Sequence, residues 1–255
     1  MNLSDRTETH GLELFESMIT ATAVTSLGDR LLVGTRERDQ VRLLELNPTT
    51  LSIQNEITRE PLSGRISDNS GETSQQTKSG TALIQLSPSN KLMLTWGHYE
   101  AGTQLRLWRR TGSDWPQEDV SVIKATEVTP DFDAIDHPTA FINQQDSRIA
   151  IVTTNGLLVL STRKAELEKY IPIPGVGSHR PPCVFSPDRK WLLTGDGDGS
   201  VWAASLLNLD RKPVKFEAHT GPIAGLAMSA NGRYLATIGE DNRLRSWRVD
   251  GFLKR

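Results

Sequence analysis

Apolar residues occur along this chain in short runs, and polar or turn-forming residues bound each run. The runs are rich in β-branched and aliphatic side chains, which is typical of short strands joined by tight turns. Five of them open with a basic residue: Arg30–Val33, Lys91–Leu94, Arg148–Val152, Lys190–Leu193 and Arg233–Ala236. The best stretch with helical spacing, Thr162–Leu167, is too short to form a stable helix by itself. The pattern therefore predicts an all-β chain.

A second apolar run follows each of these strands, and together the runs form a repeat. The last residues of the second runs fall at positions 44, 108, 160, 204 and 247, so the intervals are 64, 52, 44 and 43 residues. A period of about 40–45 residues with short antiparallel strands is typical of a β-propeller, in which each repeat forms one blade. We expect about five four-stranded blades, roughly over residues 20–60, 80–123, 135–173, 180–216 and 220–250.

Insertions account for the two longest intervals. Residues 63–80 are rich in Ser, Thr, Gln and Gly and contain almost nothing to bury, so a flexible loop is expected there. Residues 124–138 form an acidic insertion that contains Asp131, Asp133, Asp136 and His137. Because nothing in this segment imposes a coordination geometry, we interpret it as a solvated loop and expect no metal site.

The last repeat carries a motif that resembles a known family. His219-Thr220-Gly221-Pro222-Ile223, followed by Ser229-Ala230-Asn231-Gly232, Asp241-Asn242 and Trp247, is similar to a WD repeat of the β-transducin type. The resemblance implies that four side chains form a hydrogen-bonded structural tetrad in this blade: His219, Thr237, Asp241 and Trp247. Such a chain is chemically coherent, because Trp only donates, an ionised Asp only accepts, and His and Thr do both.

The other repeats resemble the motif less closely. The fourth keeps Thr194 and Asp198 but has Ala204 where Trp is expected, and Trp202 stands two residues out of frame. The second keeps a Thr and the Trp, at positions 95 and 108. The resemblance covers about residues 20–250, most tightly 178–250, and implies a single WD-repeat propeller domain over residues 1–255.

An unassigned strand, Leu12–Glu16 within residues 12–17, precedes the first repeat. WD propellers usually pair an N-terminal strand with the last blade, which protects both exposed edges. Two arrangements remain open: a closed ring of five blades, or the C-terminal part of a larger ring.

Composition and motifs point away from catalysis. The chain has 29 Lys and Arg against 31 Asp and Glu, a net charge of −2, which gives no general argument for nucleic acid or an anionic membrane. A single cysteine excludes a disulfide framework, and none of the common hydrolase, phosphate-loop or zinc-protease motifs is present. No apolar run approaches the roughly 18 residues of a membrane helix, and the N-terminal segment lacks a secretory signal. We therefore expect a cytoplasmic protein without a cofactor, and a small-molecule substrate is not expected.

The resemblance also implies where a partner would bind. In a blade with strands a to d, the b–c turns and d–a connections lie on one rim, hereafter the b–c/d–a rim, which is the usual docking face. Basic and aromatic candidates from three repeats fall on it: Arg36, Arg38, Trp96, His98, Tyr99 and Arg180. Such side chains suit an acidic protein segment. We expect a non-catalytic scaffold that binds a protein or peptide. The alternatives are a regulatory or sensor module of a larger polypeptide, and a propeller hydrolase with a central metal site.

Overall fold

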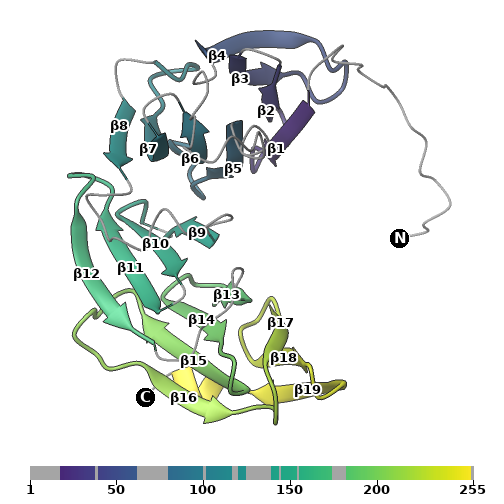
Figure 1. Cartoon of the computed structure of the whole chain (residues 1–255), viewed down its shortest axis with the longest axis vertical. Coiled ribbons are helices and arrows are strands. Elements are labelled where there is room, and N and C mark those ends of the chain that lie inside the picture. Colours follow the sequence, from purple (N-terminus) through teal and green to yellow (C-terminus); the bar gives the residue numbers. More distant parts are fainter. Residues whose placement is uncertain are drawn as a thin grey trace, which may run out of the picture. The chain divides into compact units, whose positions relative to one another are not determined.

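The computed structural model describes residues 18–37, 40–61, 80–99, 102–116, 120–124, 139–143, 145–153, 155–173 and 182–253. Within these residues the chain is almost entirely β, with one short helix near its end (Figure 1). The strands form five antiparallel sheets, each a simple up-and-down meander. The prediction of an all-β chain with five repeated antiparallel sheets is therefore confirmed. Four of the sheets have four strands, as expected, whereas the last has three among the described residues. The expected strand 12–17, most of the loop 63–80 and the acidic residues of the second insertion lie outside the described residues.

The first compact unit contains two sheets. Their strands are β1 (Met18–Val24), β2 (Leu31–Arg36), β3 (Gln40–Leu46) and β4 (Ile53–Pro61), then β5 (Gly80–Leu86), β6 (Leu92–Tyr99), β7 (Gly102–Arg109) and β8 (Val120–Lys124). Side chains alternate between the two faces of a strand, so every second residue faces the neighbouring sheet. Leu32 and Leu43 of the first sheet share a buried cluster with Met93 and Trp108 of the second.

The second compact unit contains three sheets and the helix. Its elements are β9 (Thr139–Ile142), β10 (Arg148–Thr153), β11 (Gly156–Ser161), β12 (Leu167–Pro172), β13 (Cys183–Phe185), β14 (Trp191–Gly195), β15 (Ser200–Ser205), β16 (Val214–Glu217), β17 (Ile223–Met228), β18 (Tyr234–Gly239), β19 (Arg243–Arg248) and α2 (Asp250–Leu253). One buried cluster joins Val159 of β11 to Leu192 of β14. A second joins Leu193 of β14 to Leu235 of β18, so consecutive sheets pack face to face.

The a–b turns share one design. In four of them the first turn residue accepts a hydrogen bond from the backbone N–H five positions later: Arg30 to Thr25, Arg148 to Asn143, Trp191 to Ser186 and Tyr234 to Ser229. Each of the five turns also contains one residue with positive φ, namely Gly28, Asn90, Asp146, Arg189 and Gly232. The side-chain acceptor replaces a backbone acceptor at the tightest point of the turn. Strand b therefore starts in the same register in each of these four repeats.

Candidate functional site

The last sheet contains a complete hydrogen-bonded chain of four side chains. His219 precedes β17, Thr237 lies on β18, Trp247 lies on β19, and Asp241 lies in the turn between the last two strands. His219 Nδ1 is 2.8 Å from Asp241 Oδ1, and His219 Nε2 is 2.7 Å from Thr237 Oγ1. Trp247 Nε1 donates to Thr237 Oγ1 over 2.9 Å. These four residues are the ones that the resemblance to a WD repeat implies.

Proton positions in this chain follow from the chemistry of its two ends. Trp247 Nε1 can only donate, so Thr237 Oγ1 accepts from it and directs its own proton to His219 Nε2. The imidazole then carries its proton on Nδ1 and donates to the Asp241 carboxylate. Every polar atom is satisfied when the imidazole is neutral, and Thr237 is fully buried. The hydrogen bonds among the four side chains thus tie the connection before β17 to the β18–β19 turn.

Asp241 anchors the exposed end of the chain. Its Oδ1 also accepts from the Arg243 backbone N–H over 3.1 Å, and its Oδ2 lies 3.5 Å from an Arg245 guanidinium nitrogen. Desolvation opposes ionisation of this carboxyl, but the hydrogen bonds from His219 and from the backbone of Thr220 and Arg243 outweigh it. They hold the pKa of Asp241 below its usual value. The carboxylate therefore stays ionised, as its role of pure acceptor requires.

Two other sheets contain part of this set of side-chain hydrogen bonds. In the second sheet Trp108 Nε1 donates to the buried Thr95 Oγ1 over 2.9 Å. In the fourth, Trp202 Nε1 donates to Asp196 Oδ2 over 2.7 Å, and Asp196 also accepts the Ser200 backbone N–H. The sequence pattern pointed to Asp198 at this place, which was wrong for the hydrogen bond: Asp198 is exposed, whereas Asp196 is buried.

The reason for this shift is the register of β15. Trp202 stands opposite Thr194, one pair away from the end of the ladder, so its indole reaches the first residue of the turn. At the usual Trp position, Ala204 leaves room for the packing of the neighbouring sheet. The two-residue displacement of Trp202 in the sequence was the available signal.

The structure describes only some of the residues that the sequence placed on the b–c/d–a rim. Arg36 ends β2 and is half-buried. His98 and Tyr99 lie at the end of β6, opposite Thr103 and Gly102, so the enlarged turn is a continuation of the strand pair. Nothing is described of these two side chains, and Arg38 and Arg180 lie outside the described residues.

Trp96 requires a correction. Its side chain is completely buried, so it cannot contact a partner directly as expected from the sequence. Strand β6 is paired on both sides, and every residue from Leu92 to Gly97 is buried, so both of its faces are covered. The indole is thus part of the interior of the blade.

A set of arginines on strand c was missed in the sequence. Arg42, Arg106 and Arg245 stand opposite Thr35, Thr95 and Thr237, which is the same ladder position in three sheets. Each forms an ion pair: Arg42 with Glu37 and Glu56, Arg106 with Glu60, and Arg245 with Asp241. A recurring Arg two residues before the marker positions 44, 108 and 247 was the signal.

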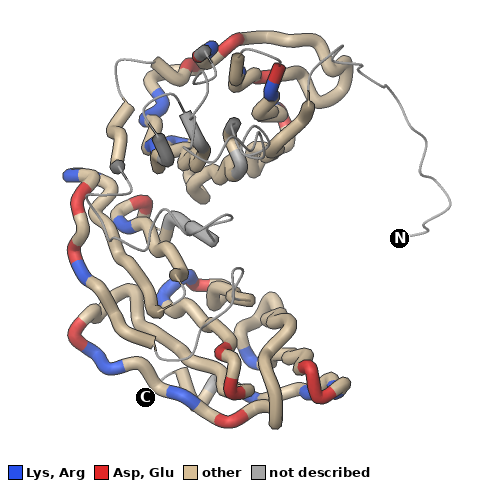
Figure 2. The backbone as a smooth tube through the Cα atoms, viewed as in Figure 1, with Lys and Arg blue, Asp and Glu red and all other residues tan. Residues whose placement is uncertain are grey.

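Acidic and basic positions are interspersed in both units, as Figure 2 shows. The best-defined local network surrounds Glu56. Its carboxylate accepts hydrogen bonds from Arg59 and Arg42, and the contact with Arg59 lowers its pKa most. Although burial acts in the opposite direction, these contacts lower the pKa of Glu56 to about 2. In the described part of the chain, no group of three or more His, Cys, Asp or Glu side chains could hold a metal ion. None of its helices is long and apolar enough to cross a membrane.

Comparison with known proteins agrees with this geometry. The family described as "WD domain, G-beta repeat" matches residues 179–202 and 211–248. The Drosophila melanogaster "Protein LST8 homolog" is 27% identical over 121 residues, which are 45% of this chain and 38% of that protein. The human "WD repeat-containing protein 55" is 38% identical over 66 residues, which are 26% of this chain and 17% of that protein. The chain thus spans less than two fifths of these curated relatives.

Solved structures show the same fold at low sequence identity. The β-propeller domain of Cps50 (Swd1) from Myceliophteria thermophila superposes with a TM-score of 0.59 at 14% identity, over 92% of this chain and 67% of that one. Hsv2 from Kluyveromyces lactis superposes with a TM-score of 0.55 at 13% identity, over 92% of this chain and 60% of that one.

Proposed function

This chain is a WD-repeat protein with a β-propeller fold, and we propose that it is a non-catalytic interaction module that binds a protein or peptide partner on its b–c/d–a rim. The observation that carries the proposal is the tetrad of His219, Thr237, Asp241 and Trp247. It ties a d–a connection to a b–c turn, so it stiffens the segments that would meet a partner. A rigid scaffold that holds variable loops is the usual basis of recognition by such folds.

Residues on the rim supply the chemistry of the proposed contact. Arg36 lies at one b–c turn, and Arg38 follows it in the sequence. His98 and Tyr99 end β6 next to the following b–c turn, and Arg180 precedes β13 in the sequence. Arginine and aromatic side chains contribute most of the anchor energy in protein interfaces, and arginines select for acidic segments. The partner that we propose is an acidic protein segment. The cytoplasmic location stays a prediction.

Two rim variants test this proposal. The unaltered protein is used as bait with the native host extract, and the captured partner is then purified for titration against the variants. We expect Tyr99→Ala and Arg36→Ala each to weaken binding by at least about tenfold. Their melting temperatures should stay close to that of the unaltered protein, because neither change opens the described core.

Leu27→Ala is the matched control. Leu27 is 84% exposed and lies in an a–b turn, at the opposite end of the strands from Arg36. Binding should be unchanged in this variant. Equal binding by all three variants, or a loss only in Leu27→Ala, would show that the partner uses another face.

A further inference from the structure

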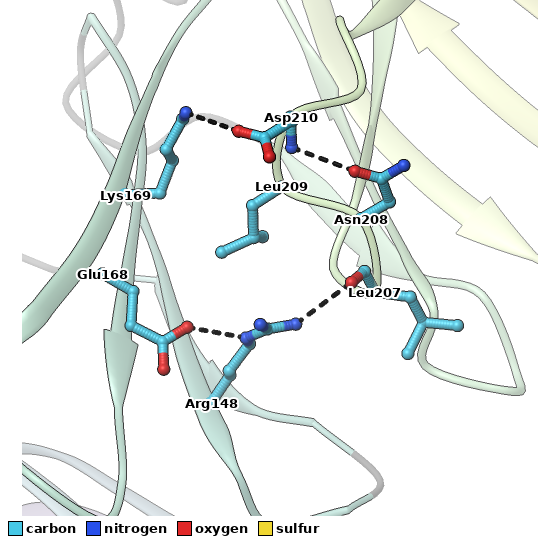
Figure 3. Close-up of a pocket in the computed structure, with 7 residues that line it drawn as sticks. All are labelled: Arg148, Glu168, Lys169, Leu207, Asn208, Leu209 and Asp210. Carbon is cyan, nitrogen blue, oxygen red and sulfur yellow. Dashed lines mark hydrogen bonds and ion pairs between the residues drawn. The ribbon is translucent and has the colours of Figure 1, made fainter.

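A polar pocket of about 430 Å³ lies on the other rim of the second unit. Its walls are the start of β10 at Arg148, the start of β12 at Glu168 and Lys169, and residues 207–210 between β15 and β16 (Figure 3). These positions follow a–b and c–d connections, so the pocket opens on the rim opposite to the one proposed above. Its volume is in the range of small binding sites in proteins.

Specific contacts hold the pocket open. The Arg148 guanidinium donates to Glu168 Oε2 over 2.8 Å and to the Leu206 carbonyl over 2.5 Å, so it bridges two neighbouring sheets. On the opposite wall Lys169 Nζ donates to Asp210 Oδ1 over 2.9 Å. Figure 3 shows Leu209 between these two ion pairs. The connection after β15 is therefore fastened to the preceding sheet at both ends of the pocket.

The pocket also offers apolar surface. Leu207 is 51% exposed, and Leu167 at the start of β12 is 42% exposed. Leu209 packs with its other side against the buried cluster between the two sheets. Exposed leucines beside a preformed pocket favour a ligand that has an apolar side chain to insert.

Charge around the pocket is positive, in contrast to the chain as a whole. Residues 163–169 and 207–212 together with Arg148 contain six basic and three acidic residues, a local net charge of +3 against −2 for the chain. Arg163, Lys164 and Lys212 are exposed and lie within five residues of the pocket lining in the sequence. Arg211 lies over the Trp191 ring, 4.6 Å from its centroid. The charges of the lining balance, because Arg148 pairs with Glu168 and Lys169 pairs with Asp210, so the excess positive charge belongs to the flanking residues.

We propose that this pocket is a second docking site, which binds an acidic linear segment of a partner protein. An apolar side chain of the segment packs on Leu209 beside the exposed Leu207, and flanking carboxylates face the exposed Arg163, Lys164 and Lys212. The wall carboxylates of Glu168 and Asp210 disfavour nucleic acid, because an evenly spaced phosphate backbone would place negative charge against them. A peptide with an apolar centre and acidic flanks avoids this repulsion. The site is independent of the rim proposed above.

Fluorescence anisotropy with synthetic peptides tests this proposal. The probe is a labelled peptide with two leucines flanked on each side by three glutamates, and the matched probe has alanines in place of the leucines. We expect saturable binding of the leucine peptide, and binding of the alanine peptide weaker by about tenfold. A poly-dT oligonucleotide is titrated in parallel and should bind no better than the alanine peptide.

Surface variants localise the binding. Lys164→Glu and Leu207→Ser should each weaken binding of the leucine peptide by about tenfold, since both side chains are exposed and their loss leaves the core intact. Arg233→Glu is the charge-matched control, because Arg233 is an exposed arginine in the last a–b turn, away from the pocket. Tyr99→Ala should leave this binding unchanged, which separates the two proposed sites.

Several results would overturn the proposal: no saturable binding to the unaltered protein, equal affinity for the two peptides, or an equal loss in Arg233→Glu. Tighter binding of the oligonucleotide that is lost in Lys164→Glu would identify a nucleic-acid site instead. None of these outcomes bears on the b–c/d–a rim.

Discussion

Thr237→Val is the sharpest test of the hydrogen-bonded tetrad. The substitution replaces the hydroxyl by a methyl group of similar size, so it removes two hydrogen bonds with little change in packing. Trp247 Nε1 and His219 Nε2, which lie 2.9 and 2.7 Å from the hydroxyl, lose their shared partner. Thr237 is fully buried and His219 is 5% exposed, so water does not easily take the place of the lost hydroxyl group.

The expected magnitude follows from the number of polar groups left unpaired. A buried donor or acceptor without a partner costs about 1–3 kcal/mol. Two such groups, one of them the half-buried Trp247 N–H, give an expected loss of about 3 kcal/mol in the free energy of unfolding. The second sheet offers a matched variant, Thr95→Val. Thr95 is equally buried, but the described residues show only Trp108 donating to it, so we expect about 1.5 kcal/mol.

Urea denaturation followed by far-ultraviolet circular dichroism measures both losses on the same scale. The slope of the transition should stay constant, because neither substitution changes the surface that unfolding exposes. A loss in Thr95→Val as large as that in Thr237→Val would refute the reasoning, since it would mean that the His219 bond contributes nothing. A neutral Thr237→Val would refute the tetrad as a stabilising element.

Three further predictions concern positions around these networks. Gly239→Ala should be strongly destabilising, because a Cβ there would lie 2.5 Å from the His219 ring; reduced solubility or a lower melting temperature would show it. Gly199→Ala should also lower the melting temperature, since its φ is +88° and a Cβ would lie 2.2 Å from the His219 carbonyl oxygen; an unchanged value would contradict this geometry. Because the pKa of Glu56 is lowered from 4.5 to about 2, its ionised form stabilises the fold above pH 4.5 and this contribution is lost as the pH falls towards 2. The difference in free energy of unfolding between the unaltered protein and Glu56→Gln should therefore shrink as the pH falls over that range. A constant difference would show that Arg59 does not stabilise the carboxylate in preference to the amide.

The polar tetrad could be named before any coordinates because the last repeat resembles a WD repeat. From His219 to Trp247 the chain forms a three-stranded meander and the connection before it, so the four side chains come from one local segment and the motif transfers directly. The same local character explains the a–b turns, in which the acceptor and the N–H it receives are five residues apart, as in Ser186 and Trp191. Turn chemistry of this kind depends on residue type and short-range geometry only.

Features that depend on register or on neighbouring sheets could not be read in this way. Trp96 looked like a rim residue by its place in an enlarged turn, but β6 is an inner strand with both faces covered, so the side chain lies inside. The bond of Trp202 to Asp196 in place of Asp198 follows from the pairing of β15, which a one-residue difference in the turn would change.

The sequence by itself determined that this protein is a chain of short antiparallel strands with a repeat near 40–45 residues, because apolar alternation and turn residues are local properties. Through its resemblance to a WD repeat, the last repeat also indicated which four side chains form the tetrad. Only the tertiary structure decided that Arg148 reaches from β10 to the Leu206 carbonyl, 58 positions away, and thereby shapes the pocket. Such a contact depends on how two sheets pack, and packing is set by many weak contacts that no single motif encodes.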